Sequence, residues 1–427
     1  MTVNRREFLK KAGTAGAGLA AAGAAAKISA PAVVRAQDTV KLSVWKAPHT
    51  TDEQVFFDEQ LAKFTEANPG IEVEYRVTPW ATWQETYTAA FASDEPPDVS
   101  YVVDSFFPKY SDAGALVDLA TLEGADLAAW QALYEPSIWD RGTRNGGTFG
   151  LPFLTGGSSF VWNKKLFAEA GLDPETPPAT WDEVVEWAKL LTKSDGSQWG
   201  YSVFDNTTGE ALNFYPIPMV NYGGNLANDD NTEWLANTPE HIKGLQLQVD
   251  TILVDKTAPP IGQFVGIDIF TQFLMGKIGM QLTLSQFILP LLGDYPDLDF
   301  GVSVPPSGPA NNLSLGGVGY WMMAEKSKHK AEAWALMEFL ASAEVMTGYC
   351  QLSNIFQTRL DVNPWEGQPK TQEFAATQKN YMVLPSMPFD YWTILNPEAE
   401  AAFSGQKSAE DALNTAAQII NERLAQG

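Results

Sequence analysis

The chain has 427 residues, with 28 Lys or Arg against 52 Asp or Glu, and its formal net charge at pH 7 is -24. This acidic balance, without a basic patch or arm, excludes nucleic acid and anionic lipid as partners. The hydrophobic content of 45% and the aromatic content of 12% support a sizeable core and exclude a disordered acidic protein.

The first 36 residues have the pattern of an export signal. Arg5 and Arg6 form a twin-arginine pattern ahead of an Ala- and Gly-rich run that ends near Ala36. The run is too weakly apolar to supply the roughly 20 apolar residues of a membrane span. The segment carries six Lys or Arg and one Glu, so its removal changes the net charge from -24 to -29. The single cysteine, Cys350, excludes disulfides and a lipid-modified N-terminus, so we expect a soluble, monomeric periplasmic protein of two domains.

Residues 40 to 103 predict a parallel sheet. Apolar residues alternate or cluster as in strands at 40–44, 71–77 and 99–103, and helices are expected between them at 54–67 and 83–92. Right-handed crossovers then place helices on both faces of the sheet. Ligands of such sheets bind beyond the carboxyl ends of the strands, so the residues after each strand are candidates for a binding site.

These strand ends carry side chains suited to sugar recognition. A carboxylate accepts hydrogen bonds from paired hydroxyls, and an aromatic face covers the apolar side of a sugar ring. Asp104 is the leading candidate because it directly follows a buried strand, although an N-cap of the next helix is the alternative. For the tryptophans the alternative is core packing, and for the lysine and histidine it is a solvated loop. The candidates are Lys46, His49, Trp80, Trp83, Asp104 and Ser105.

The stretch from Gly147 to Leu191 predicts a passage between two lobes. Two short strands meet at a glycine pair, a helix ends at Gly171, and Thr180 with Glu183 forms a capping box for the next helix. The flexible joint between the strands is the best position for ligand contacts. The candidates there are Thr155, Gly156 and Gly157.

Several runs carry a family resemblance: GLPF, WNKKLFAEAGLDP and PPATWDEVVEWAKLLTK, and earlier FTEANPGIEVEY and PPDVSYVVDSFFPKYSDAGALVDL. Together they are similar to the bacterial extracellular solute-binding proteins, the maltose-binding-like class that serves ABC importers. The resemblance implies an α/β fold, the two-lobed type II periplasmic binding protein fold, in which each lobe is a mostly parallel sheet flanked by helices. A hinge joins the lobes, which close around one ligand before docking on a membrane permease.

The same resemblance predicts domain boundaries. The N-terminal lobe is expected at 37–153 and 304–357, and the C-terminal lobe at 154–303 and 358–427. Crossings between them are expected at 153–157, 300–304 and 355–359.

The resemblance also adds site residues from the rest of the chain. Asp104 corresponds to a ligand-binding aspartate of the family, and a Gly pair brings backbone amides close to the ligand because glycine has no Cβ. An arginine of the third crossing reaches the cleft, and a late aromatic covers the sugar. The residues that match are Asn213, Phe214, Tyr215, Gln286, Gly316, Gly317, Arg359, Tyr391 and Trp392.

The expected function is capture of a mono- or oligosaccharide or polyol for an ABC importer, without a catalytic residue, metal or cofactor. An anionic sugar derivative, such as a glycerol phosphodiester, sugar phosphate or sulfonate, is the alternative, held by Arg359, Lys46, His49 and the glycine amides. A secreted carbohydrate-active enzyme is less favoured. No spacing singles out a carboxylate pair, the three histidines stand outside metal-binding motifs, and G-x-S-x-G is absent. A structural or adhesive protein would show no saturable heat of small-ligand binding.

Overall fold

The computed structural model describes residues 39–203, 214–264, 266, 268–378, 380–382, 384–385 and 387–426. The chain divides into an N-terminal unit, Met1–Asp38, and one compact unit, Thr39–Gly427, which contains every helix and strand described below. The expected export signal and the candidate Asn213 lie outside the described residues. Within the described ranges, no helix combines the length and the apolar character that crossing a bilayer requires.

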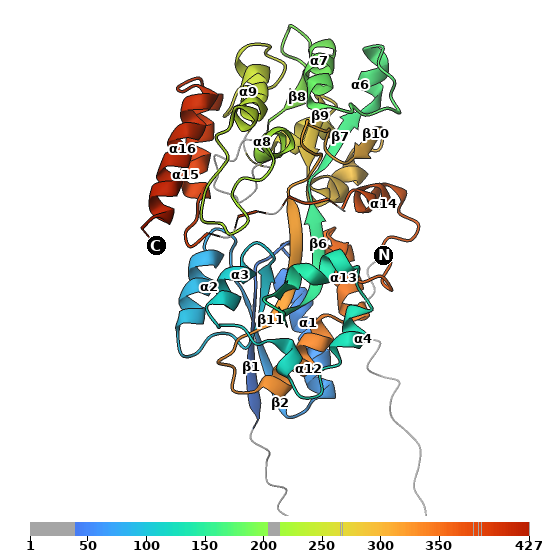
Figure 1. Cartoon of the computed structure of the whole chain (residues 1–427). Helices are drawn as coiled ribbons and strands as arrows, with labels where there is room; N and C mark the ends of the chain where they lie inside the picture. Colours follow the sequence, from blue (N-terminus) through green and yellow to red (C-terminus); the bar gives the residue numbers. More distant parts are fainter. Residues whose placement is uncertain are drawn as a thin grey trace, which may run out of the picture. The chain divides into compact units, whose positions relative to one another are not determined.

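A six-stranded sheet forms the first half of the fold. Its order is β12-β6-β11-β3-β1-β2 (Figure 1). The strands are β1 Val40–Lys46, β2 Ile71–Val77, β3 Val99–Val103, β6 Gly150–Gly157, β11 Gly316–Met323 and β12 Phe356–Gln357. Helices α1 (Glu53–Ala67) and α2 (Trp83–Ala92) connect the first three strands, and β1 pairs in parallel with both β2 and β3, which confirms the predicted parallel arrangement of these strands.

The second sheet has four strands in the order β10-β7-β9-β8. They are β7 Ser159–Asn163, β8 Trp199–Ser202, β9 Ile278–Thr283 and β10 Phe300–Ser303. A short hairpin pairs β4 Thr143–Arg144 with β5 Gly147–Thr148.

The expectation of mostly parallel sheets is wrong. β11 runs antiparallel to β3 and β6, β12 runs antiparallel to β6, and in the second sheet only β8 and β9 are parallel. The parallel pairs β1–β2 and β1–β3 have helices between their strands, which return the chain to the same end of the sheet. β7 instead follows β6 of the other sheet through Ser158 alone, and β11 follows β10 of the other sheet without an intervening helix. Both strands therefore run antiparallel to their neighbours in the sheet that they enter.

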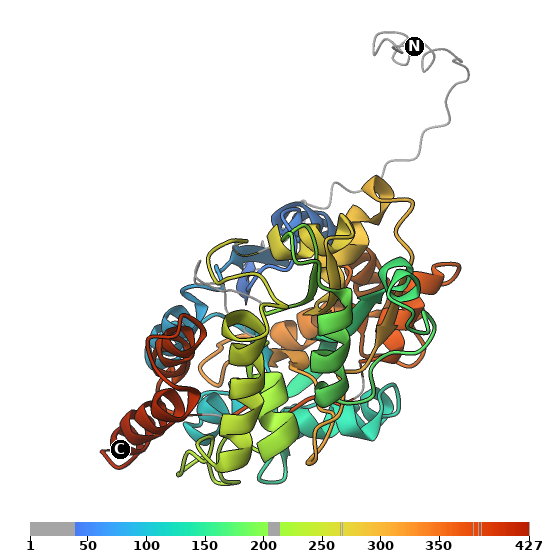
Figure 2. The same cartoon turned by 90° about the horizontal axis from the view of Figure 1, so that it is seen from above.

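Helices flank both sheets. Around the first sheet, and in the connection after β3, lie α3 Phe107–Asp112, η2 Leu119–Thr121, α4 Leu127–Gln131, α5 Pro136–Trp139, η3 Asp140–Gly142, α12 Lys330–Leu340 and α13 Ala343–Ser353. With the second sheet belong α6 Lys164–Glu169, α7 Trp181–Leu191, α8 Pro216–Gly223, α9 Pro239–Leu253, α10 Asp268–Leu274, α11 Ser285–Ile288, η4 Leu289–Asp294 and α14 Pro369–Ala376. The last helices, α15 Trp392–Phe403 and α16 Ala409–Leu424, pack on each other and beside α9 in both views (Figure 1, Figure 2).

Helix α7 confirms the predicted capping box. Thr180 Oγ1 accepts from the Glu183 backbone N–H at 3.2 Å, and Glu183 Oε2 accepts from the Ala179 N–H at 2.6 Å. Two N–H groups that the first turn leaves unpaired are thereby satisfied. The apolar face of the helix is buried through Val184 and Leu191 against the second sheet.

Three segments join the sheets. The first is Ser158, and the second is residues 304–315 between β10 and β11. After β12 the chain stays beside the first sheet, because the Leu360 N–H donates to the Leu133 carbonyl at 2.8 Å. The next element, α14, contacts β10, and Lys370 Nζ donates to the Phe300 carbonyl at 2.7 Å. We propose that the two sheets are the cores of the two lobes and that the third crossing falls in residues 361–368, later than the expected 355–359.

Candidate ligand-binding site

Asp104 directly follows β3 and forms an ion pair with Arg141 of η3. Arg141 Nη1 donates to Asp104 Oδ2 at 2.6 Å, and the exposed fractions of the two side chains are 12% for Asp104 and 26% for Arg141. Burial raises the pKa of Asp104, and the charge and hydrogen bond of Arg141 oppose that rise. Helix α3 has Phe106 at its N-cap position without a side-chain cap, so the alternative of Asp104 as an N-cap does not apply.

The glycine pair of β11 packs closely against this ion pair and its neighbours. A Cβ on Gly317 would lie 2.6 Å from Asp104 Oδ1, and a Cβ on Gly316 would lie 2.7 Å from Tyr381 Cδ1. Both distances are shorter than real Cβ contacts. The absence of a Cβ at these positions therefore lets a carboxylate and an aromatic ring approach the end of β11.

Thr155, at the end of β6, lies beside Tyr381. Thr155 Oγ1 donates to the Tyr381 hydroxyl at 3.1 Å, and Arg141 Nη2 donates to the Tyr381 carbonyl at 3.4 Å. Gly157 packs against the Tyr381 ring, while Gly156 is half-exposed. The ends of β3, β6 and β11 thus bring Asp104, Thr155 and the glycines together.

Arg141 and Tyr381 were missed at the sequence level. Arg141 lies in an irregular connection 37 residues from Asp104, and Tyr381 is 226 residues from Thr155. Neither stands in a periodic or motif-like pattern. The only available signal was residue type, a lone arginine and a lone tyrosine outside the predicted helices and strands.

Lys46 is a correction to the expected site. Its side chain is 0% exposed, and Nζ donates to Glu53 Oε1 at 2.7 Å, to the Tyr349 hydroxyl at 2.7 Å and to the Ala47 carbonyl at 2.9 Å. These partners use the donors of the ammonium group, so we remove Lys46 from the site. Burial lowers the pKa of Lys46 to about 8, and the Glu53 carboxylate opposes this shift.

His49 belongs to the same buried network. Its Nδ1 lies 2.9 Å from Lys46 Nζ, and its backbone N–H donates to Glu53 Oε2 at 3.1 Å. Burial and the Lys46 charge together lower the pKa of His49. The ring is half-buried and contacts Trp80 and Tyr101 edge-on, so His49 stays in the candidate site, unlike Lys46.

The two tryptophans at the second strand end have different surroundings. Trp83 is buried and packs edge-on against Phe106 with ring centroids 4.7 Å apart, which agrees with the alternative interpretation that it packs in the core. Trp80 is half-buried, and its Nε1 donates to the Pro48 carbonyl at 2.5 Å. Ser105 is half-exposed next to Asp104. Trp80 and Ser105 therefore stay in the candidate site, and Trp83 leaves it.

Three aromatic candidates near the second sheet are buried. Phe214 packs edge-on against Phe270, and the Tyr215 hydroxyl donates to Asn396 Oδ1 at 2.8 Å. Tyr391 is buried between the rings of Trp234 and Trp392. Core packing occupies all three, so we remove Phe214, Tyr215 and Tyr391 from the site.

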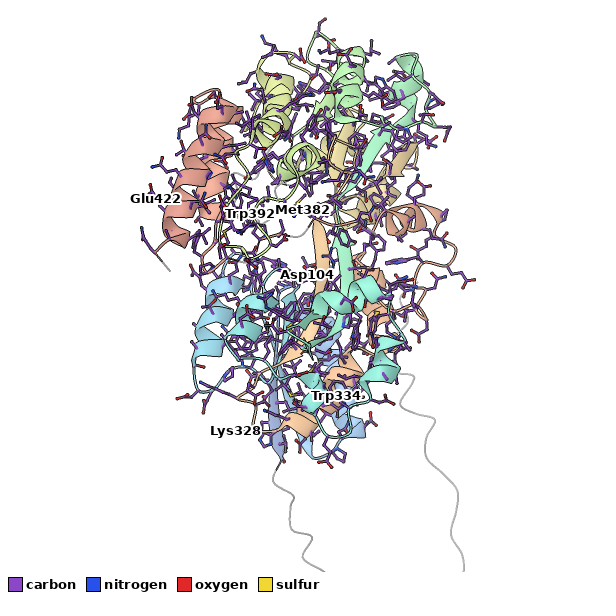
Figure 3. The ribbon with its side chains drawn as sticks, in the orientation of Figure 1. Asp104, Lys328, Trp334, Met382, Trp392 and Glu422 are labelled. Atoms are coloured by element: carbon purple, nitrogen blue, oxygen red, sulfur yellow. The ribbon has the colours of Figure 1, made fainter. Side chains whose placement is uncertain are left out.

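Gln286 and Trp392 remain. Gln286 in α11 and Trp392 at the start of α15 are half-exposed. Figure 3 labels Trp392 with Met382 and Asp104, all in the region where the elements of the two sheets meet. Of the two residues that match the late aromatic of the family, Trp392 is the one that keeps some exposure.

Arg359 is a further correction. Its Nε and Nη2 donate to the two carboxylate oxygens of Asp361 at 2.9 and 2.8 Å, and Nη1 donates to the Ala341 carbonyl at 3.1 Å. The Asp361 hydrogen bond raises the pKa of Arg359, and the guanidinium also lies 5.6 Å from the centre of the Trp130 ring. Because this cluster surrounds the end of α12, Arg359 serves local structure and does not join Asp104.

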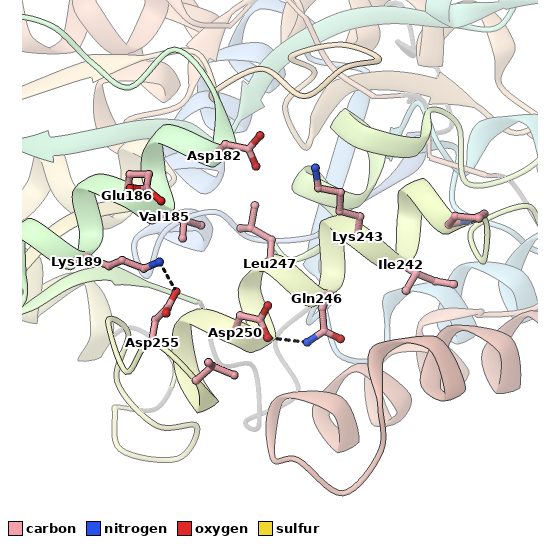
Figure 4. A pocket seen from close by; sticks show the side chains of 12 residues that line it. Asp182, Val185, Glu186, Lys189, Ile242, Lys243, Gln246, Leu247, Asp250 and Asp255 are labelled. Atoms are coloured by element: carbon pink, nitrogen blue, oxygen red, sulfur yellow. Dashed lines mark hydrogen bonds and ion pairs between the residues drawn. The ribbon is translucent and has the colours of Figure 1, made fainter.

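Among the described residues, no group of three or more His, Cys, Asp or Glu side chains could hold a metal ion. A groove of about 690 Å³ lies elsewhere, between α7 and α9 (Figure 4). An ion pair of 3.2 Å between Lys189 and Asp255 crosses one end of it. None of the predicted ligand contacts lines this groove.

Comparison with known proteins places the chain in a family. A family model described as bacterial extracellular solute-binding protein matches residues 47–347. The chain belongs to this family.

Two curated relatives cover most of this solute-binding protein. A putative binding protein of Brucella abortus is 26% identical over 75% of this chain and 76% of its own. The sn-glycerol-3-phosphate-binding periplasmic protein of Rhizobium meliloti is 27% identical over 92% of this chain and 95% of its own.

Solved structures confirm the type II periplasmic binding protein fold. An ABC substrate-binding protein from Listeria monocytogenes in complex with cycloalternan has a TM-score of 0.74 at 21% identity, covering 91% of this chain and 100% of its own. The cyclic alpha-maltosyl-1,6-maltose binding protein from Arthrobacter globiformis has a TM-score of 0.73 at 23% identity, with the same coverage of 91% and 100%. This solute-binding protein therefore has the two-lobed, hinge-linked architecture that the sequence resemblance implied.

Proposed function

We propose that this protein captures a carbohydrate, either a mono- or oligosaccharide or a polyol, between its lobes and delivers it to the transmembrane subunits of an ABC permease. The observation that carries this proposal is the partly buried ion pair between Asp104 and Arg141 at the end of β3. The names of the similar solved structures, which include cycloalternan and cyclic alpha-maltosyl-1,6-maltose, support the carbohydrate class.

The chemistry of the pair suits a diol. A carboxylate only accepts hydrogen bonds and a guanidinium only donates them, so adjacent sugar hydroxyls can donate to Asp104 and accept from Arg141. Such bonds are charge-assisted and therefore stronger than bonds between neutral groups. Half-exposed Trp80 and Trp392 are the aromatics that we propose for the apolar faces of the sugar.

The proposed site contains the candidates that keep some exposure or lie at the converging strand ends. They are His49, Trp80, Asp104, Ser105, Arg141, Thr155, Gly156, Gly157, Gln286, Gly316, Gly317 and Trp392. Asn213 remains a proposal from the family resemblance alone.

An anionic sugar derivative is the second candidate. The name of the Rhizobium meliloti relative, an sn-glycerol-3-phosphate-binding protein, favours it. In this chain Arg141 would have to receive the anion, because Lys46 and Arg359 are committed to Glu53 and Asp361. Arg141 is already paired with the Asp104 carboxylate, and the negative charge of Asp104 would repel an anionic ligand and weaken its binding.

We further propose export through the twin-arginine signal, with cleavage near Ala36, into the periplasm, where the protein acts as a monomer without enzymatic activity. The Arg5–Arg6 pattern and the family membership support this. Changing Arg5 and Arg6 to Lys should prevent export, and N-terminal sequencing of exported wild-type protein should begin at Gln37. Retained export of the double variant would contradict the twin-arginine route.

A ligand screen tests the function directly. The mature protein is heated with monosaccharides, oligosaccharides, polyols and glycerol 3-phosphate, since a ligand that binds only the folded state raises the melting temperature. Calorimetry then compares the wild type with Asp104→Asn and with Asp361→Asn, a matched control in which another Asp–Arg pair is altered.

We expect at least a tenfold loss of affinity in Asp104→Asn and an unchanged affinity in Asp361→Asn. A ligand that is anionic would identify the second candidate. The absence of any stabilising solute would refute a solute-binding role for the proposed site, and turnover of an oligosaccharide would show an enzyme instead.

A further inference from the structure

Tyr381 and its segment contact the end of β6, Ser314 between β10 and β11, Gln378 after α14, and Arg141 of the Asp104–Arg141 pair. We propose that Tyr381 is a positioning residue that couples this pair to the opening and closing of the lobes, an inference that rests on the proposed function of solute capture. Its contacts reach the β6–β7 junction, the 304–315 segment, the second sheet and Arg141.

The first contact is with the end of β6. The Tyr381 hydroxyl accepts from Thr155 Oγ1 at 3.1 Å, and its ring packs on Gly157, where an added Cβ would overlap the ring. Gly157 is followed by Ser158, the single residue between the two sheets. The Tyr381 side chain thus packs next to Ser158, which is the shortest connection between the two sheets.

The second contact is with the segment between β10 and β11. The Ser314 N–H donates to the Asn380 carbonyl, and the Met382 N–H donates to the Ser314 carbonyl, both at 2.8 Å. The two backbones form a parallel bridge at Ser314 and Tyr381. Ser314 Oγ in turn lies 3.0 Å from Ser158 Oγ, so the first and second connections and the Tyr381 segment are bonded to one another.

The third contact reaches the second sheet. The Tyr381 hydroxyl donates to Gln378 Oε1 at 2.9 Å, and Gln378 Nε2 donates to Thr377 Oγ1 at 2.9 Å. Thr377 Oγ1 lies 2.7 Å from the hydroxyl of Ser159, the first residue of β7. One phenol hydroxyl therefore bridges a strand of the first sheet and a hydrogen-bonded chain that ends on the second.

The fourth contact is with the candidate site. Arg141 Nη2 donates to the Tyr381 carbonyl at 3.4 Å, and the guanidinium lies 5.8 Å from the centre of the Tyr381 ring. The same guanidinium donates to Asp104 through Nη1 at 2.6 Å. A ligand that forms hydrogen bonds with Asp104 or Arg141 therefore contacts an ion pair whose arginine is hydrogen-bonded to Tyr381 at the junction.

This arrangement has an energetic consequence. The Tyr381 side chain is buried, and its hydroxyl is satisfied from both sides of the junction. A rotation of one sheet against the other moves Thr155 relative to Gln378, so the hydroxyl cannot keep both bonds unchanged, and a buried hydroxyl that loses a partner is costly. The hydroxyl thus contributes to the energy difference between lobe arrangements, and its removal shifts their populations.

The test removes only the hydroxyl. Tyr381→Phe keeps the ring on Gly157 but breaks the bridge. The matched control is Tyr134→Phe, because Tyr134 is also buried and its hydroxyl has no hydrogen-bond partner among the described residues. Fluorescence energy transfer measures the separation of the lobes between dyes on Lys63→Cys in α1 and Leu190→Cys in α7, side chains that are exposed, while the native Cys350 is buried and escapes labelling.

We expect the ligand-free distribution of distances to shift in Tyr381→Phe and to stay unchanged in Tyr134→Phe. The affinity for the sugar found in the screen should change by the same factor as the closed-state population, about three- to tenfold, because binding depends on the fraction of competent molecules. The double variant Tyr381→Phe/Gln378→Met should be non-additive, because each change breaks the same bond.

Identical distance distributions for wild type and Tyr381→Phe, with both proteins folded by circular dichroism, would overturn the proposal. A melting temperature that falls without any change in distances would assign Tyr381 a purely structural role and would overturn it as well. If the wild type binds no carbohydrate, the proposed function fails, while the ligand-free distances still decide the role of the hydroxyl.

Discussion

Replacing Lys46 by Met gives the sharpest test of the structural corrections. The Lys46 ammonium lies 2.7 Å from Glu53 Oε1, in surroundings where both side chains are almost completely buried. Glu53 also accepts from the hydroxyls of Tyr75 and Tyr349 and from the backbone N–H of His49. Met has a similar length and fills the space of the lysine stem, so the change removes the charge and leaves little cavity.

The expected cost comes from the charge left behind. Removing one partner of a buried ion pair destabilises a protein by about 3–5 kcal/mol, because the other charge stays buried without compensation. The double variant Lys46→Met/Glu53→Gln should recover about 2 kcal/mol, since an amide can keep the tyrosine hydrogen bonds without a charge. Lys41→Met is the control on the same strand, because its ion pair with Glu72 is exposed, and it should change stability by no more than about 0.5 kcal/mol.

Urea unfolding followed by tryptophan fluorescence measures these differences in the free energy of unfolding, and calorimetry measures ligand affinity of the folded variants. We expect the affinity of Lys46→Met to match the wild type. A stability loss below about 1 kcal/mol together with a large loss of ligand affinity would refute the reasoning. Lys46 would then be the ligand contact that the sequence predicted.

The same structure supports two more predictions. Arg359→Gln should lower stability by about 1 kcal/mol or less and leave the affinity for neutral and anionic ligands unchanged in calorimetry, because Asp361 occupies the guanidinium. Thr180→Ala should cost about 1 kcal/mol by removing the N-cap of α7, whereas Thr180→Ser should cost less in thermal melts, since a serine hydroxyl can accept from the Glu183 N–H.

Two candidate residues show which features of the site depend on neighbouring residues in the sequence and which depend on residues far away in the chain. Asp104 was found because a buried strand followed by a carboxylate is visible in a few consecutive residues, and the strand end fixes where that side chain begins. Lys46 is the last residue of β1, yet its ammonium bonds Tyr349, which is 303 residues away in the chain. Sequence spacing could not distinguish these two strand ends, because the partner that buries the lysine comes from α13.

The sequence by itself determined the alternation of β1, α1, β2, α2 and β3, the capping of α7 and the family of the protein. Each of these depends on periodicity, on turn chemistry or on ordered runs of neighbouring residues. Tertiary structure decided the antiparallel strands that exchange sheets, the commitment of Lys46 and Arg359 to buried and local carboxylates, and the meeting of Tyr381 with Thr155, Ser314 and Arg141. The physical reason is that burial and hydrogen-bond partners depend on which segments pack together. These segments can lie hundreds of residues apart, as Tyr381 does from Thr155 and Arg141 and Tyr349 from Lys46.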